Sequence, residues 1–64
     1  MTDDQKPAVP LELQIKAVGR EIGMRRGAYP KFVASGRMKQ EAADAELAAM
    51  EAVYQTLKDL QRQQ

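Results

Sequence analysis

The stretch EAADAELAAMEAVYQTLKDL, which runs from Glu41 to Leu60, decides the fold of this chain. It contains no glycine or proline and is rich in alanine, the residue with the highest helix propensity. Its larger apolar residues are separated by three, three, one, three and three positions, which fits the repeat of an α-helix. They are Leu47, Met50, Val53, Tyr54, Leu57 and Leu60. The stretch therefore predicts a long amphipathic helix that buries a wide face.

Glu46 interrupts the apolar face of this predicted helix. At about 100° per residue, one side of the helix gathers Ala43, Met50, Val53, Leu57 and Leu60, with Leu47 and Tyr54 at its edge. The Glu46 carboxylate either reaches solvent at the edge of that side or forms a partly buried ion pair with an arginine. The Arg25-Arg26 pair is the obvious source of that arginine. We assign Arg25 and Glu46 as a candidate structural ion pair.

The preceding part of the chain predicts a first helix from about residue 10 to residue 28. Its apolar seam has spacings of four, three and four and consists of Leu11, Ile15, Val18 and Ile22. The same rhythm continues to Arg25 and Tyr29, so Arg25 faces the side of the seam. Pro30 favours a helix end before it, because a residue that precedes proline is pushed out of the helical region.

A short helical turn, at about residues 30–35, is expected to join the first helix to the second, which should span about residues 39–62. Gly36 suits the C-terminal stop of that turn. The predicted fold is all-α, with two long antiparallel helices. Residues 1–9 are polar and lack periodicity, which is typical of a flexible tail. Residues 10–64 should form one helical-hairpin domain.

The first helix carries a second, weaker apolar stripe, which consists of Leu13, Ala17 and Met24. A single partner helix cannot cover both stripes, so these residues are a candidate interface. At 64 residues and without cysteine, the chain is only marginally able to fold alone. Dimerisation of two hairpins into a four-helix bundle is therefore expected, either through this stripe or through the long second helix.

Gly19, Gly23 and Gly27 recur every four residues in the first helix. They either weaken that helix by about 1 kcal/mol each, or they form a shallow groove that lets another backbone approach closely. The sequence leaves both interpretations open.

Positive charge gathers before residue 40. Residues 11–39 carry seven basic and two acidic residues, for a net charge of +5, whereas residues 40–64 carry two basic and five acidic residues, for a net charge of −3. Arg20, Arg26, Lys31, Arg37 and Lys39 are candidate anion-binding residues, with Tyr29 and Phe32 among them to stack on bases. The acidic second helix is unlike the basic recognition helix of a helix-turn-helix protein, which makes nucleic acid the less favoured partner.

Several functional classes are excluded or disfavoured by composition. Histidine and cysteine are absent, and Ser35 is the only serine, so no nucleophile with a recognisable base is available and we expect no catalytic residue. No phosphate-binding loop of the accepted spacing occurs. We expect no cofactor, and no metal site, because Glu41, Asp44 and Glu51 are typical of a solvated helix side. No signal-peptide or transmembrane pattern is present, so a cytoplasmic location is expected.

The pattern Arg25-Arg26-x-x-Tyr29-Pro30-x-x-Val33-x-x-Gly36-Arg37-Met38, followed by Ala43-x-x-Glu46-x-x-x-Met50-Glu51, resembles a family of small phage and prophage proteins. The resemblance covers roughly residues 18–60. Family members often have Thr or Ser near position 39, where this chain has Lys39. Members are mostly uncharacterised, so the resemblance implies a viral origin and a helical hairpin, and no functional residue is carried over.

Together these features predict a small non-enzymatic protein–protein interaction module. We expect a phage accessory protein that acts in the cytoplasm of a bacterial host, forms a homodimer and binds a host protein. The alternatives are a nucleic-acid-binding accessory protein that uses the basic turn, and a structural phage component.

Overall fold

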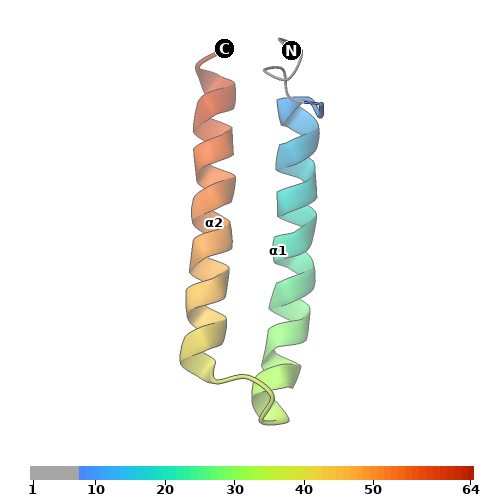
Figure 1. Ribbon diagram of the computed structural model, residues 1–64, viewed down its shortest axis with the longest axis vertical. Helices are drawn as coiled ribbons and strands as arrows, with labels where there is room; N and C mark the ends of the chain where they lie inside the picture. The colour runs from blue at the N-terminus through green and yellow to red at the C-terminus, as the bar shows by residue number, and fades with distance from the viewer. Residues whose placement is uncertain (1–7) are drawn as a thin grey trace.

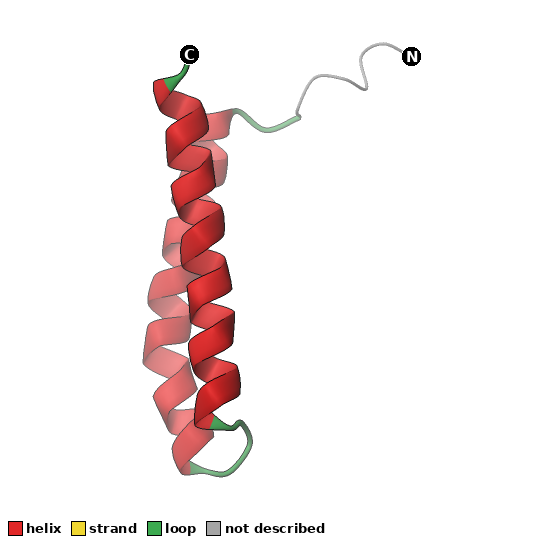
Figure 2. Cartoon of the chain, turned by 90° about the vertical axis from the view of Figure 1, so that its left-hand side faces the viewer, coloured by secondary structure: helices red, strands yellow, loops and turns green. Residues whose placement is uncertain are grey.

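Two antiparallel helices make up the fold (Figures 1 and 2). The structure is a computed structural model that describes residues 8–64. Helix α1 spans Leu11–Ala34 and helix α2 spans Gln40–Arg62, and no strand occurs within the described residues. The predicted all-α hairpin is confirmed, whereas most of the tail predicted at residues 1–9 lies outside the described residues. We call the end that contains residues 35–39 the loop end, and the end that contains Leu11 and Arg62 the open end.

The turn at the loop end is fixed by Gly36. Its φ angle of +81° lies in the left-handed region, which glycine adopts without the steric cost of a Cβ atom. The Gly36 N–H donates to the carbonyl of Val33 (3.1 Å) and the Arg37 N–H donates to the carbonyl of Phe32 (2.9 Å). These two bonds form the Schellman motif that ends a helix. The predicted stop at Gly36 is therefore confirmed.

The predicted end of the first helix at residue 28 is wrong, because α1 continues through Pro30 to Ala34. The segment predicted as a separate turn at residues 30–35 is mostly the last part of α1. Pro30 removes one hydrogen-bond donor and crowds the carbonyl one turn before it, but only one turn of helix follows it. Tyr29, Phe32 and Val33 are half-buried, so packing against the hairpin offsets the local preference for a break.

The two helices meet along a seam that repeats every four and three residues on each of them. We call it the pairing seam; it consists of Leu11, Ile15, Val18, Ile22, Arg25 and Tyr29 on α1 and of Ala43, Leu47, Met50, Tyr54 and Leu57 on α2. All of these residues are buried or half-buried, and Ala43 is only 2% exposed. The spacing on α1 confirms the predicted apolar seam of the first helix.

On α2 the buried side differs from the predicted one. Leu47 and Tyr54, predicted at the edge of the face, belong to the pairing seam and are half-buried. Val53 and Leu60, predicted within the face, remain 47% and 46% exposed. The apolar face of α2 is broader than the surface that a single partner helix covers, and α1 packs on one half of it.

Only one of the three regularly spaced glycines lies at a close contact between the helices. A Cβ atom on Gly19 would come within 3.3 Å of the Tyr54 ring, whereas nothing lies within 4 Å of a Cβ atom built on Gly23 or Gly27. Close approach therefore explains Gly19, and within the described residues Gly23 and Gly27 face open space. Neither helix of the described chain is long and apolar enough to cross a membrane.

These contacts predict that replacing the three glycines by alanine will change the stability of the hairpin by different amounts. Gly23→Ala and Gly27→Ala should each raise the free energy of unfolding by about 0.5–1 kcal/mol, because alanine loses less backbone entropy in a helix. Gly19→Ala should gain less than either, because its methyl group presses on the Tyr54 ring. Urea denaturation followed by circular dichroism measures all three. Equal gains at the three positions would mean that the Tyr54 ring moves aside without cost.

Candidate functional site

A second seam runs beside the pairing seam, and among residues 8–64 no further helix covers it. It lies one residue earlier on both helices and repeats with the same spacing. We call it the free flank; it consists of Gln14, Ala17, Glu21, Met24 and Ala28 on α1 and of Ala42, Glu46, Ala49, Val53, Thr56 and Leu60 on α2. Apart from Glu21 and Glu46, these side chains are uncharged. One broad side of the hairpin is therefore mostly small or apolar.

Large apolar side chains are exposed at the open end of the free flank. Leu13 is 47% exposed, and together with Ala17, Val53 and Leu57 it lines an open groove of about 620 Å³. Val9 lines the same groove. Gln14 is the one polar side chain among the described residues that line the groove, and its amide nitrogen donates to the carbonyl of Val9 at 2.8 Å. The groove is therefore an apolar surface that is open to solvent.

The candidate interface predicted at Leu13, Ala17 and Met24 falls on or beside this free flank. Leu13 and Ala17 line the groove, whereas Met24 is 61% exposed, nearer the middle of α1. The sequence analysis offered the second helix as an alternative surface for dimerisation, but it did not separate Val53 and Leu60 from the single wide face that this helix was expected to bury. Their spacing of seven residues from each other and from Glu46 is the signal that identifies a second seam on α2.

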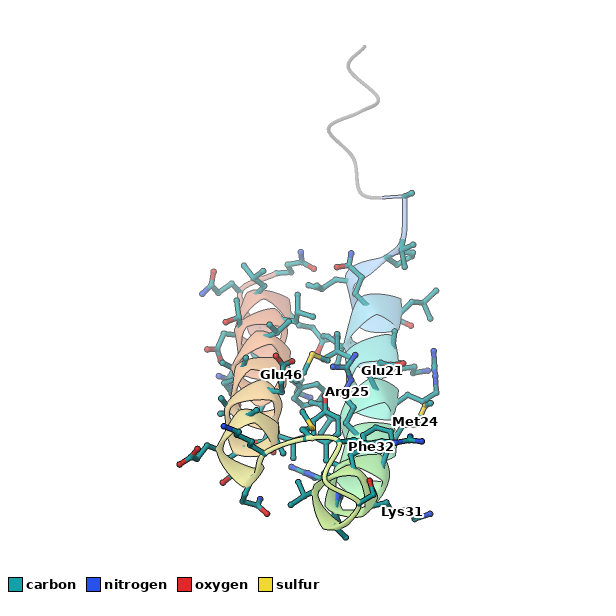
Figure 3. All side chains as sticks on the ribbon, turned by 60° about the horizontal axis from the view of Figure 1, so that its bottom comes forward. Glu21, Met24, Arg25, Lys31, Phe32 and Glu46 are labelled. Atoms are coloured by element: carbon teal, nitrogen blue, oxygen red, sulfur yellow. The ribbon has the colours of Figure 1, made fainter. Side chains whose placement is uncertain are left out.

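The ion pair predicted between Arg25 and Glu46 is not formed among the described residues. Arg25 instead pairs with Glu21 on its own helix (Nε–Oε1, 3.1 Å) and donates a hydrogen bond to the Tyr29 hydroxyl (3.2 Å). Glu21 is one helical turn away and needs no reach across the hairpin, so it is the closer partner. Glu46 stays exposed on α2, which agrees with the solvent-exposed alternative. Figure 3 shows Arg25 and Glu21 on α1, with Glu46 on α2.

The contacts of Arg25 favour its charged form. The hydrogen bond to Glu21, followed by the hydrogen bond to Tyr29, raises the pKa of Arg25 above its ordinary value. A group with a raised pKa contributes its stabilisation below its ordinary pKa and loses it only as pH rises further. The Arg25 guanidinium therefore stays positively charged at neutral pH.

The opposite side of the hairpin is charged along its length. Arg26 on α1 pairs with Glu51 on α2, which makes Arg26 the arginine that crosses between the helices. Asp44, Lys58 and Arg62 follow on the same side of α2 at helical spacing. Charged side chains at these positions favour contact with water. The two sides of the hairpin therefore differ in chemical character, with charges on one side and mostly small or apolar side chains on the free flank.

The five candidate anion-binding residues do not lie together in the structure. All five are exposed. Lys31, Arg37 and Lys39 lie at the loop end, where the Arg37 guanidinium is 5.7 Å from the centre of the Phe32 ring. Arg26 is paired with Glu51, and Arg20 lies about three helical turns before Lys31 on α1. The basic cluster at the loop end is therefore smaller than the sequence suggested.

Within residues 8–64, no group of three or more His, Cys, Asp or Glu residues is placed to hold a metal ion. Comparison of the chain with protein-family models, with curated proteins and with solved structures found no match. The functional argument therefore depends on the residues of this chain.

Proposed function

We propose that this chain is a non-enzymatic protein–protein interaction module that associates through the free flank. The observation that carries the proposal is the second seam, where Val53 and Leu60 on α2 are almost half exposed beside Leu13 on α1. Helical surfaces of this composition bind other helical surfaces by burying the apolar side chains. The first use that we propose is homodimerisation, in which two hairpins form a four-helix bundle.

The small core of the hairpin supports association. Only Ile15, Ile22 and Ala43 are buried among the described residues, and the chain has no cysteine to supply a disulfide. A domain of this size gains little stability from a core alone and is commonly stabilised by association. Burial of the free flank would enlarge the core without any change in the hairpin.

The second use that we propose is binding of a host protein by a phage accessory protein in the bacterial cytoplasm. The resemblance of residues 18–60 to small phage and prophage proteins supports this biological setting. The absence of histidine and cysteine supports a non-enzymatic role. The Ser35 hydroxyl donates to the carbonyl of Phe32 at 3.1 Å, so the single serine serves the end of α1.

Val53→Asp should weaken self-association at least tenfold, because it places a charge in the middle of an apolar interface. Light scattering across a concentration series measures the molar mass, and thermal melts of the same samples should show a melting temperature that rises with concentration. Ala48→Asp is the matched control, since Ala48 is exposed on α2 outside the free flank. Equal association of the two variants would contradict the proposed surface.

Nucleic-acid binding is the second candidate function. The observation in its favour is that Lys31, Arg37 and Lys39 are exposed near the loop, and none of the three forms an ion pair among the described residues. Phosphates bind such side chains. The aromatic residues predicted to stack on bases, Tyr29 and Phe32, are half-buried and their ring centres are 6.4 Å apart. Nucleic-acid binding therefore ranks below protein binding as a candidate function. A structural role in the phage particle also ranks below it.

A further inference from the structure

We propose that the free flank is occupied by a second copy of this chain, with both loop ends at the same end of the bundle. In this arrangement, Lys31 of each copy pairs with Glu46 of the other. The inference rests on the proposed function and names both the partner and its orientation. It follows from three features of the described residues: the angle between the two seams, the position of the exposed apolar side chains and the position of the charges.

The angle between the seams indicates that the occupant supplies two helices. The free flank precedes the pairing seam by one residue on each helix, so the two seams are about 100° apart around each helix axis. The helices of a four-helix bundle stand at the corners of a square, so each meets its two neighbours at about a right angle, whereas the helices of a three-helix bundle stand at the corners of a triangle and meet their neighbours at a sharper angle. A second hairpin therefore fits both seams better than a single helix does.

The exposed apolar residues select the orientation. Of the exposed large apolar residues on and beside the free flank, Leu13, Val53 and Leu60 lie in the half of the hairpin nearer the open end, and Met24 lies near the middle of α1. A two-fold axis parallel to the helices brings the two open ends together, so that these side chains cover one another. A two-fold axis perpendicular to the helices would instead place the open end of each copy against the basic loop end of the other.

The charges fit the same orientation. Arg26 and Pro30 line the same hollow as Ala43 and Leu47, so Glu46 lies at the height of the α1 segment between Arg26 and Pro30. With parallel hairpins, α1 of the second copy lies beside α2 at that height. Side chains on a helix lean toward its N-terminus, which directs Lys31 of the second copy toward Glu46.

The pairing also balances the charge of the interface. Glu21 is neutralised by Arg25 within each copy, which leaves Glu46 as the acidic group of the free flank without an ion pair among the described residues. Lys31 is exposed one turn beyond Gly27, next to the free flank. Two Lys31–Glu46 pairs would therefore leave the bundle with no unpaired carboxylate between the two copies, which a buried interface requires.

An exchange of charges between two separate chains tests the inference. Lys31→Glu places two carboxylates at each pair, and Glu46→Lys places two ammonium groups there, so each variant alone should dimerise about tenfold more weakly than the native chain. An equimolar mixture of the two variants should form a heterodimer with an affinity within about threefold of the native dimer, because both of its pairs are again opposite in charge. Sedimentation equilibrium measures the affinities.

Lys16→Glu and Glu41→Lys are the matched controls, because both residues are exposed outside the free flank. Neither should weaken the dimer, and their mixture should show no preference for the heterodimer. The gain in affinity of the mixed Lys31→Glu and Glu46→Lys chains over each variant alone should be smaller in about 1 M salt, where the electrostatic screening length is about 3 Å. Far-ultraviolet circular dichroism of each sample checks that the hairpin is retained.

The possible outcomes separate this inference from the proposed function. Rescue by mixing supports a second copy in the stated orientation. A dimer that Val53→Asp disrupts, but that mixing does not rescue, overturns the orientation and leaves the proposed interaction surface in place. A chain that stays monomeric at all concentrations overturns this inference and the proposed homodimerisation. A dimer that is indifferent to Val53→Asp overturns the free flank as the surface through which the chain associates with itself.

Discussion

Ile22→Ala is expected to lower the free energy of unfolding by about 2–5 kcal/mol, the usual cost of removing a large aliphatic side chain from a core. Ile22 is 6% exposed and is one of three buried residues in the described chain. A small domain without disulfides or metal has only about 3–5 kcal/mol of stability. Much of the protein should therefore be unfolded at 25 °C, as measured by circular dichroism and urea titration.

The conservative replacement Ile22→Val is the control for this experiment. It removes one methylene and should cost about 0.5–1.5 kcal/mol, which leaves the hairpin folded. If Ile22→Ala cost no more than Ile22→Val, the space around this side chain would collapse freely, and the stability of the hairpin would have to come from elsewhere. The two variants thus measure how strongly the pairing seam holds the helices together.

Pro30→Ala is expected to have the largest effect in the opposite direction, with a gain of about 1–2 kcal/mol in the free energy of unfolding. Alanine restores the N–H that donates to the carbonyl of Arg26 and removes the clash of the proline ring with it. Part of this gain is lost, because proline also restricts the unfolded chain by about 0.4–1 kcal/mol. Thermal and urea denaturation measure the net effect.

Pro10→Ala is the matched control for Pro30→Ala. Pro10 is the N-cap residue of α1, a position where no intrahelical donor is lost, so its replacement should bring no gain. A loss of stability in Pro30→Ala would show that the proline ring itself holds the last turn of α1 against the hairpin. In that case the half-buried neighbours Tyr29 and Val33 would depend on Pro30 for their positions.

Apolar periodicity was sufficient to predict the hairpin, the seam of α1 and the start of α2 at Gln40 to within one residue. It was not sufficient at Pro30. The rule that a helix ends before proline describes a local preference of the backbone, and the packing of the following residues decides the outcome. Phe32 and Val33 are half-buried in the last turn of α1, and the gain from this packing cannot be read from spacing.

The candidate site shows a different limit of sequence reasoning. The predicted face of α2 is centred between Met50 and Val53, which is midway between the pairing seam and the free flank. A spacing pattern shows the full apolar arc of a helix, but it does not show which half of the arc the neighbouring helix covers. For the same reason, Glu46 was placed on the side of α2 that faces Arg25, whereas it lies in the free flank, and the local partner Glu21 was overlooked.

The five-residue connection between α1 and α2 also sets the order in which the hairpin forms and opens. Contacts near the loop, such as those around Val33 and Ala43, close a short stretch of chain, whereas contacts around Leu11 and Leu57 close nearly all of it. The entropy cost of bringing two residues into contact grows with the length of chain between them. We therefore expect the two helices to associate first near the loop and then progressively toward the open end. The helices then separate first in the half of the hairpin where Leu13, Val53 and Leu60 are exposed. A partner bound there would hold together the part of the hairpin that forms last.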